Sequence, residues 1–283
     1  MKDAALEGCV TVIGSGTLLP SSARSSSAYH LALPSAGPVQ GDSSKRSRSI
    51  LLDCGNGTLH ALARHRVDWE AIDVVLITHY HGDHVGDLVA LLAAWRLQGR
   101  TRPLTLLGPS DFRDFLEALA SVHGPWVSEP GFPLQVVALG PNGSWSDAQD
   151  SLRVESFPTP HTDVSICVRL SGSWGTLGYT GDTGPSDSVA GFLTGCDVLL
   201  AECALTDPPR FEGHLTPASL VSLAAQARPS LLVVTHVYPP TEPHLIVEEV
   251  GRRWGGRVEA AHDGMTLTIS PGDVDVDRPA RGE

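Results

Sequence analysis

Short apolar runs alternate with amphipathic segments along most of the chain. Runs rich in β-branched residues and bounded by glycine, proline or polar residues predict strands, whereas apolar residues that recur every three or four positions predict helices. The predicted strands are 9–17, 29–33, 49–57, 73–79, 104–108, 134–140, 152–161, 165–172, 175–184, 197–204 and 230–239, and segment 257–269 is expected to end the ordered part. The predicted helices are 60–66, 87–99, 111–124, 216–227 and 244–256.

The order of these segments predicts an α/β fold. Strands come in sequential clusters separated by helices, a pattern that favours two sheets packed face to face with helices outside. No linker divides the pattern, so we expect a single domain over residues 1–283. The Ser- and Pro-rich segment 34–49 is expected to be a mobile loop, and the polar tail 271–283 is expected to fray.

Composition is consistent with a globular intracellular protein. Of the 283 residues, 41% are hydrophobic and 18% are charged, which is not the balance of a disordered chain. The sequence shows no apolar run of about 18 residues and no signal peptide, so we expect no membrane span and no export. The five cysteines form no CxxC pair, which favours reduced thiols and a cytoplasmic location.

The charge balance argues against a nucleic-acid surface. The formal net charge is −12, and Lys2 and Lys45 are the only lysines. A protein that grips a polyanion needs a basic face to meet the phosphates. A small phosphate held on a metal is still compatible with this composition.

One histidine-rich loop carries the strongest chemical signal. The segment THYHGDH directly follows an apolar strand and places four metal-binding side chains within six residues. His79 and His81 alternate and can point to one side, while Asp83 and His84 can turn toward a neighbouring point. Imidazole and carboxylate are zinc-type ligands, and a short loop holds them at low entropic cost. The loop therefore predicts a metal site.

Three later positions repeat this design of a polar ligand just past an apolar strand. They are His161 after LRVESFPTP, Asp182 after GTLGYTG, and His236 after SLLVVT. Together with the loop they provide five histidines and two aspartates. This set is large enough for two metals that share one carboxylate.

The motifs THYHGDH, PH, YTGDT and VTHVYP, in this order, resemble the metal motifs of the metallo-β-lactamase fold. The resemblance extends from CVTVIGSGT to HDGMTLTI. It implies an αββα four-layer sandwich with two divalent metal ions at one edge, zinc by default and Mn²⁺ or Fe²⁺ as alternatives. Carried over by position, His79, His81 and His161 hold the first metal, Asp83, His84 and His236 hold the second, and Asp182 bridges them.

A second segment narrows the resemblance to the ribonuclease Z branch. In AECALTDPPRFEGHLTPASL, Glu202, His214 and Thr216 are similar to the acidic-and-histidine segment of that branch. The resemblance implies that His214 opens a helix near the metals and protonates the leaving group. It also implies a metal-bridging hydroxide as nucleophile, with Asp83 as a catalytic residue that orients it.

One departure favours small substrates over tRNA. Bacterial ribonuclease Z carries a long tRNA-gripping arm between the histidine and aspartate that match His161 and Asp182. Here only 21 positions separate them, and two predicted strands fill the interval. We therefore expect a phosphodiesterase that hydrolyses small phosphodiesters, cyclic nucleotides among them, and we do not expect nucleic acid as the main partner.

Three alternatives and the oligomeric state stay open. The same fold could serve a tRNA 3′ endonuclease of the ribonuclease Z type, or an acyl hydrolase such as a lactonase or β-lactamase. A non-catalytic scaffold would retain only the fold, and the complete ligand set argues against it. A homodimer is compatible with the sequence.

Overall fold

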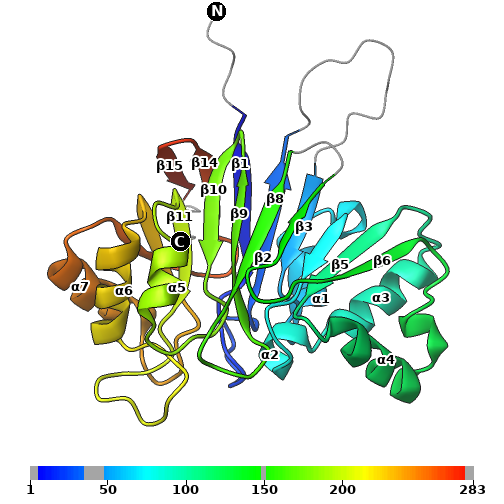
Figure 1. Cartoon of the computed structure of the whole chain (residues 1–283), viewed down its shortest axis with the longest axis horizontal. Helices are drawn as coiled ribbons and strands as arrows, with labels where there is room; N and C mark the ends of the chain where they lie inside the picture. Colours follow the sequence, from blue (N-terminus) through cyan, green and yellow to red (C-terminus); the bar gives the residue numbers. More distant parts are fainter. Residues whose placement is uncertain (1–5, 35–47, 148–150, 278–283) are drawn as a thin grey trace, which may run out of the picture.

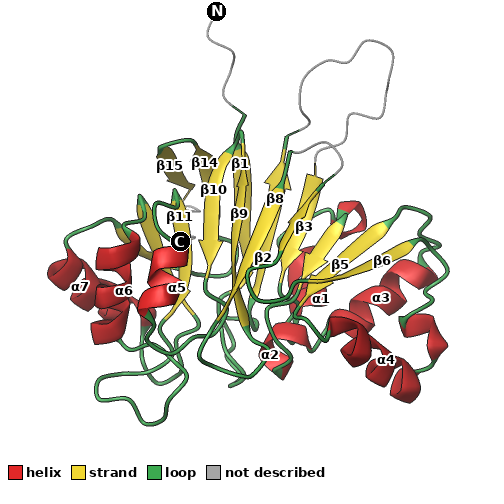
Figure 2. Ribbon diagram, in the orientation of Figure 1, coloured by secondary structure: helices red, strands yellow, loops and turns green. Residues whose placement is uncertain are grey.

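The computed structural model describes residues 6–34, 48–147 and 151–277. Two sheets face each other in the middle of the molecule, and helices cover both outer faces, which gives four layers (Figure 2). The chain passes from one half to the other once the first sheet is nearly complete, as the colour gradient in Figure 1 shows. The predicted αββα sandwich is thus present.

The first sheet has eight strands. In spatial order they are β15 (Asp273–Asp277), β14 (Thr266–Ser270), β1 (Gly8–Gly14), β2 (Ala28–Leu33), β3 (Arg48–Leu52), β4 (Val74–Leu76), β5 (Leu104–Gly108) and β6 (Leu134–Ala138). Strands β3 to β6 run parallel, and the other pairs are antiparallel. The helices of this half are α1 (Thr58–Arg64), α2 (Gly82–Val85), α3 (Leu88–Leu97) and α4 (Phe112–His123), with short 3-10 turns at Trp69–Ala71 and Pro125–Val127.

The second sheet has seven strands. Their spatial order is β13 (Val258–Ala260), β12 (Leu231–Thr235), β11 (Val198–Glu202), β10 (Gly175–Tyr179), β9 (Ile166–Gly172), β8 (Arg153–Pro158) and β7 (Ser144–Ser146). Strands β10 to β13 run parallel. This half carries the helices α5 (Asp187–Phe192), α6 (Pro217–Ala227) and α7 (Pro243–Trp254).

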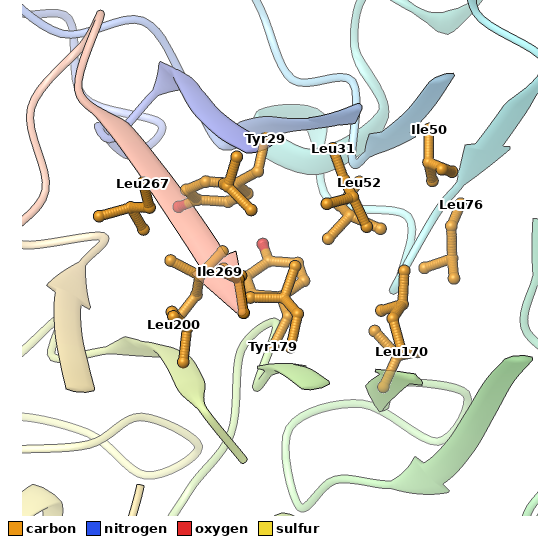
Figure 3. Close-up of a cluster of buried hydrophobic side chains, with 14 of the residues drawn as sticks. Tyr29, Leu31, Ile50, Leu52, Leu76, Leu170, Tyr179, Leu200, Leu267 and Ile269 are labelled. Atoms are coloured by element: carbon orange, nitrogen blue, oxygen red, sulfur yellow. The ribbon is translucent and has the colours of Figure 1, made fainter. Parts of the chain in front are cut away.

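The central strands β4, β11 and β12 are buried on both faces because each lies between the opposite sheet and its own helices. In β4, Val74 and Leu76 join the core between the sheets, whereas Val75 joins the core beneath the helices. This alternation follows from the two-residue period of a strand. Figure 3 shows the central core, where Tyr29 and Tyr179 lie among leucine and isoleucine side chains.

Two expectations about irregular segments need correction. Residues 273–277 were expected to fray, but they form β15 and pair along their whole length with β14. The alternation in DVDVD buries Val274 against the central core while its aspartates face solvent. Within the expected loop 34–49, Arg48 and Ser49 belong to β3, and Arg48 pairs with Asp147 at 3.0 Å. Residues 35–47 lie outside the described residues, as do 278–283 of the expected tail.

Parallel strands place their carboxyl ends at one edge of each sheet. The segments that follow β3, β4, β10, β11 and β12 therefore meet at a common edge of the sandwich. In the part of the chain that the structure describes, no helix is long and apolar enough to cross a membrane.

Candidate active site

A first group of donors comes from the loop after β4 and from the end of β8. His79 Nε2 lies 3.1 Å from His81 Nδ1, and His161 Nε2 lies 3.0 Å from the same His81 atom. His79 is buried, whereas His81 is exposed. Three imidazole nitrogens thus converge at a point that solvent can reach.

A second group lies deeper and is wholly buried. It consists of Asp83, His84 and His236, whose ligand atoms lie within 4.8 Å of one another. Asp83 and His84 sit in α2, which begins at Gly82, and His236 follows β12. His236 Nε2 lies 3.1 Å from Asp83 Oδ2.

Asp182 lies between the two groups and presents one oxygen to each. Its Oδ2 is 3.7 Å from His79 Nε2 and 3.6 Å from His161 Nε2. Its Oδ1 is 3.2 Å from His84 Nε2 and 3.7 Å from His236 Nε2. All seven side chains predicted as metal ligands are therefore brought together, in the grouping that the resemblance implied.

Close packing behind Asp182 requires a glycine. Gly181 has a φ of 53°, and a Cβ there would lie 3.0 Å from the Thr78 side chain. A larger residue would need both a strained backbone and space that Thr78 occupies. The glycine thus lets the β10 segment approach the histidine loop.

Asp53 lies behind the candidate ligands and bonds to His84 and to Thr78. The sequence analysis did not predict this role. Its carboxylate accepts hydrogen bonds from the Thr78 amide and hydroxyl, at 2.7 and 2.9 Å, and from His84 Nδ1 at 2.7 Å. The Tyr179 hydroxyl, from the opposite sheet, donates a fourth bond at 2.7 Å. Asp53 follows the apolar strand β3 just as Asp182 follows β10, so the same signal was present in the sequence.

The unpaired atoms of the site fit a divalent cation. His84 donates through Nδ1 to Asp53, and when its Nε2 carries no proton the lone pair faces Asp182 Oδ1 across 3.2 Å. Neither of these buried atoms has a hydrogen-bond partner among the described residues, and His236 Nδ1 has none either. Buried acceptors that face each other are costly unless a cation lies between them. The donor set of imidazoles and carboxylates is that of zinc and similar metals.

The electrostatics favour neutral imidazoles at His79 and His161, whereas at His84 the charges of Asp182 and Asp53 outweigh burial and raise the pKa well above its usual value. Burial lowers the pKa of His79 well below its usual value and also lowers the pKa of His161. Burial alone would raise the pKa of Asp182, but His236 and His84 outweigh it and hold that pKa well below its usual range. Neutral imidazole and ionised carboxylate are the forms that bind metals.

Next to the two groups lies a histidine–glutamate pair. His214 Nδ1 donates to Glu202 Oε1 at 2.9 Å, and the Thr183 amide donates to the same oxygen at 2.8 Å. Burial opposes a charge on His214, but the hydrogen bond and charge of Glu202 outweigh it and raise the pKa of His214. His214 Nδ1 is 3.9 Å from Asp182 Oδ2. Both predicted residues thus reach the site.

The helix start predicted after His214 is present. Thr216 is the N-cap of α6, its hydroxyl accepts from the Ser219 amide, and Pro217 is the first helical residue. This cap fixes the segment that carries His214. Asp182, His214 and His236 also form a third set of donors within 4.8 Å, so His214 lies close enough to the cluster to bind metal itself.

A sequence profile described as Beta-lactamase superfamily domain matches residues 48–237, a span that contains all seven candidate ligands. The chain belongs to the beta-lactamase superfamily. The solved structure of the metallo-beta-lactamase fold protein YhfI from Bacillus subtilis is similar to it, with a TM-score of 0.76 and 23% identity over 93% of this chain and 99% of that protein. The predicted metallo-β-lactamase fold is confirmed.

This member of the beta-lactamase superfamily has ribonuclease Z relatives. The ribonuclease Z of Aeropyrum pernix is 27% identical, and the match covers 92% of this chain and 98% of that protein. The structure of human tRNase Z, short form, matches with a TM-score of 0.68 and 25% identity, covering 91% of this chain and 98% of that one. The predicted ribonuclease Z-like resemblance is confirmed, the homologues are hydrolases, and the fold implies divalent metal binding.

Proposed function

We propose that the chain is a dinuclear metal-dependent phosphodiesterase acting on small phosphodiesters, cyclic nucleotides among them. The observation that carries this proposal is the position of Asp182, which presents Oδ1 to the buried donor group and Oδ2 to the outer one. His214 lies beside it, with Nδ1 3.9 Å from Asp182 Oδ2. Two-metal sites of this kind suit the displacement of an alkoxide from phosphorus. The ribonuclease Z relatives favour a phosphodiester rather than an acyl bond.

The ligand assignment follows the two donor groups. His79, His81 and His161 would hold one divalent ion, Asp83, His84 and His236 would hold the other, and Asp182 would be shared. When bound, the two ions would polarise the phosphoryl oxygens and lower the pKa of a nearby water. Zinc is the expected metal, with manganese or iron as alternatives.

His214 is positioned to move one proton. Glu202 fixes Nδ1 as a donor, so Nε2 is the atom free to meet substrate. As water attacks phosphorus it releases one proton to solvent, the bond to the leaving oxygen breaks, and the proton on Nε2 passes to that oxygen, which leaves as an alcohol. Because Glu202 raises the pKa of His214, the protonated form is available. Proton donation of this kind contributes about 10²–10⁴-fold to a rate.

Asp83 has the second catalytic role in this proposal. Its side chain is nearly buried, and its Oδ2 lies beside His236 in the inner group. Burial alone would raise its pKa, but the His236 hydrogen bond and the nearby histidines outweigh it and lower that pKa. An ionised carboxylate at this point can accept a hydrogen bond from the attacking water and orient it.

The structure favours a small substrate over tRNA. Strands β9 and β10 form an antiparallel pair that fills the interval between His161 and Asp182, so no arm projects there. The net charge of −12 also disfavours a polyanion. The second candidate is a tRNA 3′ endonuclease, which the 27% identity to a ribonuclease Z favours.

A parallel turnover screen of the metal-loaded protein tests the proposal. The panel contains bis(p-nitrophenyl) phosphate, 2′,3′- and 3′,5′-cyclic nucleotides, pre-tRNA and an aryl lactone. We expect the small diesters to have the highest kcat/KM. Cleavage of pre-tRNA at its 3′ boundary with a higher kcat/KM would select the endonuclease, and turnover of the lactone alone would select an acyl hydrolase.

A further inference from the structure

Two aromatic rings border the histidine side of the site. The Phe211 ring lies 5.5 Å from the His214 ring at an interplanar angle of 81°. The Tyr238 ring lies 6.3 Å from His214 at 80° and 5.6 Å from His236 at 89°. Phe211 keeps 51% of its surface exposed, so a large apolar ring faces solvent next to the proposed proton donor.

The segment after β1 adds apolar side chains beside the histidine loop. Leu18 and Leu19, in the segment after β1, are 57% and 47% exposed. Leu18 Cδ1 lies 3.7 Å from where a Cβ on Gly82 would be, beside the ligand His81. We call Leu18, Leu19, Phe211 and Tyr238 the apolar rim.

The rim holds a large share of the exposed apolar side chains. Six large hydrophobic side chains are exposed within the described residues, and three of them belong to the rim. The other three lie on outer helices: Leu97 on α3, Val122 on α4 and Leu245 on α7. Single exposed apolar residues are ordinary, whereas a group around a polar site marks a ligand surface.

The chemistry of the rim selects one kind of ligand. Base faces stack on aromatic side chains without needing charge, and the exposed neighbours of Phe211 in the chain are one cation and one anion, Arg210 and Glu212. Arg24, which lies close by, donates from Nη1 to the Val237 carbonyl at 3.0 Å and so helps to hold the segment before Tyr238. A planar apolar group attached to a phosphodiester matches such a border better than a polyanionic backbone does.

We propose that Phe211, assisted by Tyr238, binds the nucleobase of a nucleoside phosphodiester while the phosphate lies at the two donor groups. This proposal rests on the proposed function and narrows its substrate class. Because both rings adjoin His214, the base-bearing part of the substrate would lie beside the group that donates the proton. Phe211 is then a specificity-determining residue.

A pair of matched substrates tests this subsite. A nucleoside 2′,3′-cyclic phosphate and glycerol 1,2-cyclic phosphate present the same five-membered cyclic diester, and only the first carries a base. Phe211→Leu keeps an apolar side chain but removes the ring, and we expect kcat/KM to fall about tenfold on the nucleotide, as for the loss of one stacked base. Little change is expected on the glycerol compound, and Phe211→Trp should restore the nucleotide rate.

The controls separate stacking from general damage. Leu245→Ala alters a side chain with the same 51% exposure on α7, and it should change neither rate. Metal content and melting temperature should be unchanged in the Phe211 variants. Equal losses on both substrates, or no loss on either, would overturn the subsite.

A binding measurement keeps the subsite testable if the proposed function fails. Calorimetry on the metal-loaded protein compares AMP with ribose 5-phosphate, which differ by the base. Wild-type protein that hydrolyses neither cyclic diester would contradict the proposed function. The subsite would still be supported by about tenfold tighter binding of AMP that Phe211→Leu abolishes. Equal affinities for the two ligands would overturn it.

Discussion

Glu202 holds His214 by a 2.9 Å hydrogen bond to Nδ1, and this bond joins the end of β11 to the segment that opens α6. Glu202 is itself fixed by the amides of Thr183, Ala204 and Leu215. The imidazole therefore has a defined orientation and tautomer, which a proton donor requires.

The proton-donor role predicts a dependence on the leaving group. His214→Ala should lower kcat on a cyclic nucleotide by about 10²–10⁴-fold, because its alkoxide must be protonated to leave. The loss should be much smaller on bis(p-nitrophenyl) phosphate, whose nitrophenolate leaves without a proton. Steady-state kinetics on both substrates check this prediction.

The amount of metal bound by His214→Ala is the control. It is needed because the donor atoms of His214, Asp182 and His236 lie within 4.8 Å of one another and could share a metal ion. A proton donor can be removed without loss of metal. Equal losses on the two substrates, or a drop in bound metal measured by elemental analysis, would remove His214 from the proton-donor role.

The shared position of Asp182 predicts two metal ions per chain. Gently purified or metal-saturated protein should approach two equivalents by elemental analysis. Asp182→Ala should bind less metal and lose most activity, because both donor groups lose the carboxylate that faces them. A folded wild-type sample that takes up only one equivalent at saturation would contradict the two-metal proposal.

If the substrate is a small phosphodiester, its rate of hydrolysis should depend only weakly on salt concentration. Hydrolysis of a small diester should change less than about threefold between 50 and 200 mM salt, because few Lys or Arg contacts are involved. Rates on the diester and on pre-tRNA should be measured side by side over this range. A steep salt dependence together with efficient pre-tRNA cleavage would favour the endonuclease instead.

The two buried tyrosines offer a matched test of ligand positioning. Tyr179→Phe removes the hydroxyl that donates to Asp53, whereas Tyr29→Phe removes one that bonds to Thr235 at 2.6 Å. Each should destabilise the fold by about 1 kcal/mol. Only Tyr179→Phe should also weaken metal binding, because Asp53 orients His84, and the loss is expected to be up to about tenfold. Chelator competition measures the affinity, and equal affinities in the two variants would contradict this role.

His30, which is not one of the candidate ligands, predicts a pH dependence of stability. Burial lowers its pKa to about 4, and its Nε2 lies 2.7 Å from the Ser49 hydroxyl. Below pH 6.5 the unfolded chain binds a proton at this position and the folded chain does not, so stability falls as pH drops toward 4. Between pH 7.5 and 5 this one group should cost about 2 kcal/mol.

Urea unfolding of wild-type protein and His30→Gln at the two pH values measures this effect. The difference between the two proteins isolates His30 from the carboxylates and metal ligands that titrate in both. The variant should lose less stability on acidification than the wild type. Parallel losses in the two proteins would show that His30 titrates normally when folded.

The sequence by itself determined the fold class and the types of the candidate ligands. Apolar strands and amphipathic helices have local periods, and these were enough to predict the layered architecture. His79, His81, Asp83 and His84 fall within one short loop, so their proximity is local as well. The more distant candidates His161, Asp182 and His236 could be predicted because a polar residue after an apolar strand marks the same edge of a sheet.

Only the tertiary structure decided which groups support these ligands and how the site is bordered. Asp53 and Tyr179 come from different sheets, and nothing local in the chain pairs them. Tyr238 reaches His214 only because the segment after β12 lies beside the segment that opens α6. The strand β15 likewise needs β14 beside it, since a short polar segment buries little surface alone. Contacts between distant segments depend on how the two sheets pack, and a local pattern carries no information about that packing.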